Sequence, residues 1–139
     1  MTCDNKNLLT INLPNCKSFY SSVCRSCHSL TQVTAPLLTD LYGSAFYKCS
    51  SLQEINLPQC GNGNTWGVGT NAFADCTSLR KVTLPLITSM NPSAFANCTA
   101  LKEFYAPKLA GNSSTPFTNV KSFESVTVGY ATVPKLWAG

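Results

Sequence analysis

Apolar and polar positions alternate in a ten-residue phrase that recurs along the chain at nearly fixed spacing. The phrase begins with cysteine, carries leucine fourth and an apolar residue seventh, and ends with proline. Its copies are Cys27–Pro36, Cys49–Pro58, Cys76–Pro85 and Cys98–Pro107, with weaker copies around Leu8 and Phe123. Successive leucines lie 22 residues apart, except that Leu79 follows Leu52 by 27. A fixed period of this size predicts a solenoid, in which each repeat buries its apolar side against its neighbours.

Each phrase contains the pattern of a short β-strand. In the second copy Ile55 and Leu57 share one side of the strand and Asn56 takes the other, because side chains alternate along a strand. Stacked copies would form a parallel sheet with one buried side. The closing proline has no N–H to donate, so the ladder of hydrogen bonds should end there.

A second apolar line follows the strand, and a recurrent Ser/Thr/Asn-Ala/Pro-Phe triplet follows that line. The apolar line consists of Phe19, Leu41, Val68 and Met90, and the triplets begin at Ser44, Asn71, Ser93 and Thr115. Residues of these types cap helix starts by accepting hydrogen bonds from N–H groups. The pattern therefore predicts one helical or 3₁₀ turn in each coil, with the phenylalanine anchoring it in the core.

The whole chain fits one domain over residues 1–139, with about six coils over 5–129 and a cap or tail over 130–139. The net charge of +4 is mild and spread along the chain, which argues against a nucleic-acid partner. The sequence contains no run of 18 apolar residues, so it does not predict a membrane span. The first 15 residues do not resemble a signal peptide. We expect an extracellular or cell-surface location if a signal peptide has been removed, and a cytoplasmic location otherwise.

The recurring run Ala-Phe-x-x-Cys-x-Ser-Leu-x-x-Ile-x-Leu-Pro resembles the BspA-like leucine-rich repeat over residues 5–129. The resemblance implies a right-handed leucine-rich-repeat solenoid, an α/β repeat with short parallel strands on one face and bends and single turns on the other. It also implies binding of proteins or adhesion, as in surface proteins of bacteria, protists and phage-borne reading frames, without catalytic residues. Asn5, Cys24 and Val120 depart from the motif, which suits atypical end repeats.

The eight cysteines allow several interpretations. Cys27, Cys49, Cys76 and Cys98 recur in register, while Cys16 and Cys60 take positions that are leucine or isoleucine elsewhere, so the six are expected to be buried thiols. A disulfide from Cys3 to Cys24 or Cys16 is an alternative for an exported chain. The Cys24–His28 string also matches a haem attachment motif or half of a zinc site, but the repeat register accounts for it, and no cofactor or metal is expected.

Two surfaces are candidates for partner binding. The outward side of the predicted sheet carries Arg80, Lys81, Lys102 and Tyr105, and solenoids bind partners on such faces. The five-residue insertion between Leu52 and Leu79 carries Asn64 and Trp66, and insertions in repeats form loops, often on the binding side. A purely solvated sheet, and a Trp66 folded back on the coil edge, are the alternatives for the two surfaces.

The function predicted from these features is non-enzymatic binding of a protein, by adhesion or host-surface interaction. A small cytosolic inhibitor that occludes an enzyme is one alternative. A carbohydrate-binding module that uses Trp66 and Tyr105 against a glycan is the other.

Overall fold

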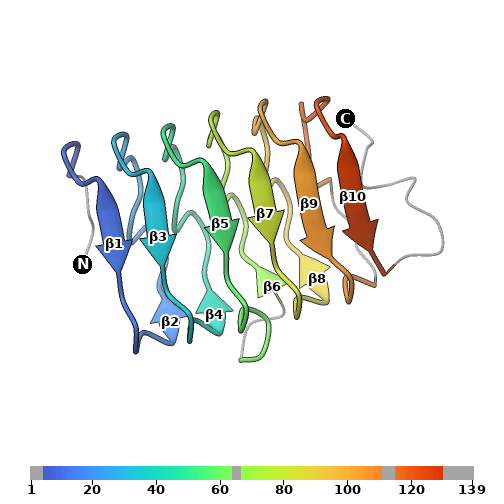
Figure 1. Cartoon of the computed structure of the whole chain (residues 1–139), viewed down its shortest axis with the longest axis horizontal. Coiled ribbons are helices and arrows are strands. Elements are labelled where there is room, and N and C mark those ends of the chain that lie inside the picture. Colours follow the sequence, from blue (N-terminus) through green and yellow to red (C-terminus); the bar gives the residue numbers. More distant parts are fainter. Residues whose placement is uncertain (1–4, 64–66, 111–114, 130–139) are drawn as a thin grey trace.

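The computed structural model describes residues 5–63, 67–110 and 115–129. Within them the chain winds into stacked coils whose strands form two rows (Figure 1). The front row consists of β1 (Thr10–Asn12), β3 (Gln32–Thr34), β5 (Glu54–Asn56), β7 (Lys81–Thr83), β9 (Glu103–Ala106) and β10 (Ser125–Val128). The second row consists of β2 (Ser18–Phe19), β4 (Asp40–Leu41), β6 (Gly67–Val68) and β8 (Ser89–Met90). The predicted parallel solenoid is confirmed.

All strand pairs are parallel and keep the register that the repeat predicts. Ile55 of β5 faces Val82 of β7, and Val82 faces Phe104 of β9, so the apolar positions of successive coils fall into line. The front row divides into a β1–β3 pair and a four-stranded sheet from β5 to β10, while β2, β4, β6 and β8 form one sheet. Because the side-chain period is two, this register keeps every inward position in the core.

Stacked phenylalanine rings form the centre of the core. The rings of Phe46 and Phe73 lie 5.2 Å apart, and those of Phe73 and Phe95 lie 5.1 Å apart, both pairs nearly parallel. Phe117 continues the stack beyond Phe95 at 5.6 Å. In the first coil Cys24 takes the phenylalanine position, and the ring of Phe19 from the second row instead covers Phe46 at 5.3 Å.

The predicted helical or 3₁₀ turns are wrong, because the described residues contain no helix. The triplets at Ser44, Asn71 and Ser93 instead begin turns whose first and fifth residues have positive φ, as at Ser44 (57°) and Lys48 (61°), and in the turn that begins at Thr115 only the fifth residue does. The N–H of Phe46 donates to the carbonyl of Ala72 in the next coil at 2.8 Å, rather than to its own turn. The serine or asparagine is therefore no helix cap. Asparagine in particular recurs at such positions because it adopts left-handed backbone more readily than most residues.

The polar residues at the fifth position of these turns form a ladder of their own. The Asn97 Nδ2 donates to the Asp75 Oδ1 at 2.7 Å, and the Asn119 Nδ2 donates to the Asn97 Oδ1 at 2.8 Å. All three residues have φ near 60°. Side-chain hydrogen bonds between coils thus offset part of the cost of this backbone conformation.

The predicted burial of the repeat cysteines is confirmed, and the structure gives the reason for their recurrence. Three of these thiols donate to a carbonyl at a phenylalanine position 25 or 30 residues earlier in the chain. The donors and acceptors are Cys49 to Cys24 at 3.1 Å, Cys76 to Phe46 at 3.2 Å and Cys98 to Phe73 at 3.1 Å. The Phe46 carbonyl also accepts the N–H of Cys49, so the thiol of Cys76 satisfies its second lone pair. Cys60 is buried as well, but the prediction is wrong for Cys16, which is only half-buried because no described coil precedes its own.

Because these thiols are buried, we expect the folded chain to lose stability at high pH. Burial raises the pKa of Cys98 to about 12, and burial with the nearby Asp40 carboxylate raises the pKa of Cys60 to about 12, against an ordinary 9.0. The unfolded chain therefore releases these protons first. The free energy of unfolding should hold below pH 9.0 and then fall by about 1.4 kcal/mol per pH unit for each such thiol.

Urea denaturation at a series of pH values between 8 and about 11 measures this slope. Cys98→Ala should make the fall in the free energy of unfolding less steep by about 1.4 kcal/mol per pH unit, the contribution of one thiol. A slope that is the same in the variant and the parent would contradict the assignment.

Candidate functional site

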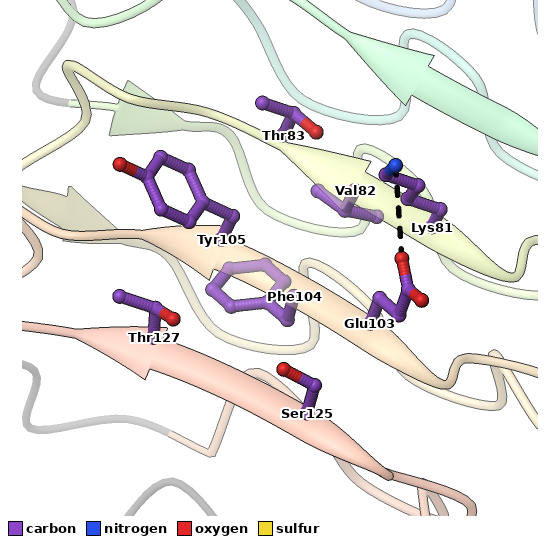
Figure 2. Close-up of a pocket in the computed structure, with 8 residues that line it drawn as sticks. All are labelled: Lys81, Val82, Thr83, Glu103, Phe104, Tyr105, Ser125 and Thr127. Carbon is purple, nitrogen blue, oxygen red and sulfur yellow. Dashed lines mark ion pairs between the residues drawn. The ribbon is translucent and has the colours of Figure 1, made fainter.

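The outward side chains of β7, β9 and β10 form a candidate surface site. In register across these strands lie Thr83, Tyr105 and Thr127, and one step along lie Lys81, Glu103 and Ser125. Together they line a shallow hollow of about 300 Å³ over the buried Val82 and Phe104. Figure 2 shows the Tyr105 side chain between Thr83 and Thr127. We call this surface the Tyr105 face.

Tyr105 is the exposed aromatic residue of this face. Tyr105 is 46% exposed, while its neighbours in the strand, Phe104 and Ala106, are buried. The alternation follows from the two-residue period of the strand. The ring is thus held on a fixed backbone with hydroxyl groups of two threonines on the adjoining strands, an apolar surface bordered by hydrogen-bonding groups.

Charged residues on the Tyr105 face and directly beside it lie in lateral pairs. The Lys81 Nζ lies 3.7 Å from the Glu103 Oε2 (Figure 2), and the Lys102 Nζ lies 3.5 Å from the Glu124 Oε1. All four side chains are more than half exposed, so each pair contributes about 0.2–1 kcal/mol. The Arg80 Nη2 donates to the Gln53 Oε1 at 3.0 Å. These contacts orient the long side chains more than they stabilise the fold.

Of the six residues predicted from the sequence, Lys81 and Tyr105 line the hollow of the Tyr105 face, whereas Arg80 lines a separate hollow with Gln53, Thr77, Ser78 and Ala100. Lys81 is the first residue of β7 and Tyr105 lies within β9, while Arg80 and Lys102 directly precede these two strands. Sequence reasoning did not single out Glu103, Thr83 or Thr127 as site residues, although all three occupy outward strand positions. The sequence feature that could have identified them is their shared register with Lys81 and Tyr105 on neighbouring strands.

The other two predicted residues, Asn64 and Trp66, lie outside the described residues. The beginning of their loop is seated on the solenoid. The Gly61 N–H donates to the Thr39 carbonyl at 3.0 Å. Gly63 lies so close to Asp40 that a Cβ placed there would come within 2.5 Å of both carboxylate oxygens. Asp40 itself is buried, and it accepts hydrogen bonds from the hydroxyls of Thr39 at 3.0 Å and Ser18 at 3.5 Å.

The Cys24–His28 string does not form a converging site. Cys24 and Cys27 are buried in the core, whereas His28 is exposed and its Nδ1 lies 3.4 Å from the Ser50 Oγ. Each residue thus occupies its repeat position, as the register predicts. Over residues 5–63, 67–110 and 115–129, no three histidine, cysteine or acidic side chains cluster as metal ligands would.

The periodic coils, the cysteine ladder and the phenylalanine stack agree with a comparison to protein families. The family model described as a BspA type leucine rich repeat region matches six copies over residues 2–124. The chain belongs to the BspA-type leucine-rich repeat family. The match covers nearly all of the coils that the 22-residue period defines. It includes β7 and β9 of the Tyr105 face and ends directly before β10.

Further comparison adds no specific relative to this BspA-type assignment. Neither the curated proteins nor the solved structures give a significant match. In the part of the chain that the structure describes, no helix is long and apolar enough to cross a membrane.

Proposed function

We propose that this BspA-type chain is a non-enzymatic binding module that engages a partner protein through the Tyr105 face, in adhesion or host-surface interaction. The observation that carries the proposal is the exposed Tyr105 ring at the centre of a face whose charged neighbours are paired. Tyrosine is among the residues that dominate binding energy at protein interfaces. The family assignment supports the same class of function, because repeat solenoids present extended binding surfaces.

A rigid face of this kind favours binding because little order is lost on association. The backbone of Tyr105 is fixed on both sides by parallel pairing with β7 and β10. The ion pairs already restrict Lys81 and Lys102. The side chains that a partner contacts therefore have little conformational freedom left to lose, which lowers the entropic cost of forming the complex.

The test compares two exposed tyrosines that lie on different parts of the solenoid. Tyr105→Ala should weaken capture of the partner about 30-fold, as expected for a hot-spot loss of about 2 kcal/mol. Tyr20 is more exposed, at 67%, but follows β2 in the second row, so Tyr20→Ala is the matched control and should leave capture unchanged.

Immobilised parent and variant chains would be exposed to solubilised host-surface proteins, and the retained proteins measured by quantitative mass spectrometry. Loss of the same protein with Tyr20→Ala but not with Tyr105→Ala would contradict the proposed face. Retention of an enzyme that the chain then inhibits would favour the inhibitor alternative. A Tyr105-dependent signal on a glycan array would favour the carbohydrate alternative.

A further inference from the structure

The N-terminal end of the solenoid is less covered than any equivalent surface inside it. Coil 1 (residues 5–26) has four inward apolar positions that are only half-buried, whereas the equivalent positions of coil 2 (residues 27–48) are buried. The half-buried residues are Leu8, Ile11, Cys16 and Val23, and their buried equivalents are Leu30, Val33, Leu38 and Ala45. Coil 2 owes its burial to coil 1, and no described coil covers coil 1 in the same way.

This end also carries an apolar hollow. A space of about 370 Å³ is lined by Leu8, Ile11, Leu13, Phe19 and Val23 together with Cys16, Ser18 and Cys24. Leu13 is 37% exposed, although its equivalent in coil 2, Ala35, is 1% exposed. A contiguous apolar surface of this kind marks an interaction site on a soluble protein.

The opposite end of the front row presents the complementary edge. β1 and β10 are its first and last strands (Figure 1), and each pairs with one neighbour among the described strands. Val126 and Val128 of β10 are half-buried, whereas Phe104 and Ala106, their register partners in β9, are buried. Both ends thus carry an inward apolar row and an outward polar row.

We propose that the C-terminal end of one copy of this chain docks on the N-terminal end of a second copy, with β10 pairing in parallel with β1. The contact continues the interface that already joins each coil to the next. In that register Ser125 lies beside Thr10, Val126 beside Ile11 and Thr127 beside Asn12, so apolar residues meet in the core and polar ones outside. If β10 were shifted by one residue along β1, its polar residues would face the core. The cost of burying them fixes the register.

Charge does not oppose this contact. Glu124 directly precedes β10 and forms an ion pair with Lys102. In the proposed register it lies beside Leu9 of the second copy, a residue that is 61% exposed in the single chain. No like charges therefore face each other along the strand. Since the two ends are different surfaces, the contact is heterologous and leaves one free end of each kind, so assemblies should grow with concentration.

Complementation between two end variants tests the proposal. Ile11→Arg places a charge in the inward row of β1, and Val126→Arg does the same in β10. Each variant alone should remain monomeric in sedimentation velocity, while the parent forms dimers and longer species as concentration rises. An equimolar mixture should form a dimer that grows no further, because only one intact end of each kind remains.

Outward variants serve as controls, because Thr10→Arg and Ser125→Arg change the exposed side of the same strands and should leave association intact. Leu13→Glu replaces Ile11→Arg if circular dichroism shows that the latter is unfolded, since Leu13 is already partly exposed. A parent that stays monomeric up to about 1 mM would overturn the proposal. It would also be overturned by a dimer that Ile11→Arg abolishes but Val126→Arg does not affect, which would indicate a symmetric contact between two N-terminal ends.

Discussion

Replacing Phe73 with alanine is expected to lower the free energy of unfolding by about 3–5 kcal/mol. The Phe73 ring is fully buried and stacks on Phe46 on one side and Phe95 on the other, at 5.2 and 5.1 Å. Its loss leaves a cavity between two rings and removes two stacked contacts, which contribute about 0.5–1.5 kcal/mol each beyond the area buried. Because the neighbouring coils are themselves held by this stack, the cavity cannot collapse easily.

Urea denaturation followed by circular dichroism measures the effect, with Tyr20→Ala as the control. Tyr20 also stacks on an aromatic ring, that of Tyr42 at 5.5 Å, but it is 67% exposed. Its replacement should therefore cost less than about 1.5 kcal/mol. Equal destabilisation by the two variants would show that the stack is not the centre of the core.

The repeat period made the architecture predictable, because a solenoid is specified one coil at a time. Ile55 and Leu57 are both buried in the structure, as the alternation along their strand indicates, and so is the repeat leucine Leu52. The same register placed Lys81 and Tyr105 on the outward side of neighbouring strands. Local pattern was sufficient here because every coil repeats the same contacts with its neighbours.

The conformation of the turns was not predictable from local pattern. Ser44 and Asn71 are residue types that suit a helix cap, and the following Ala-Phe pair suits a helix. The structure instead directs the N–H groups of Phe46 and Phe73 to carbonyls of the following coil, at 2.8 Å each. These hydrogen bonds join segments more than 20 residues apart, so they leave no signature in a short window of sequence.

The hollow of the Tyr105 face was likewise hidden from single-strand reasoning. Thr83 and Thr127 flank Tyr105 only because three strands pair in register. A second hidden feature is the role of the Cys76 and Cys98 thiols as donors to carbonyls that lie 30 and 25 residues earlier in the chain. Burial explains a small apolar residue at those positions, but only the geometry explains why cysteine, with a weak S–H donor, recurs there.

Gly67 is the position in the insertion where substitution should be most costly. Its φ is 148°, a backbone conformation that side chains rarely adopt, and it pairs in β6 with Ser89 of β8. A Cβ on Gly67 would lie 1.9 Å from the Ser89 carbonyl oxygen, a backbone atom of the adjoining coil. The neighbour cannot move aside without breaking the ladder between β6 and β8.

Gly67→Ala is therefore expected to destabilise the chain by about 3 kcal/mol, from backbone strain of about 1–3 kcal/mol and overpacking of about 1–3 kcal/mol. Gly43→Ala is the matched control, since a Cβ there would lie 3.1 Å from the Thr70 carbonyl oxygen without a positive φ, and its cost should stay below about 1 kcal/mol. Urea denaturation measures the free energy of unfolding of both variants, so that the two losses of stability can be compared. If Gly67→Ala unfolds no more easily than Gly43→Ala, the coil–coil contact at β6 yields to the added methyl group, and the insertion is joined to the solenoid less firmly than its backbone geometry indicates.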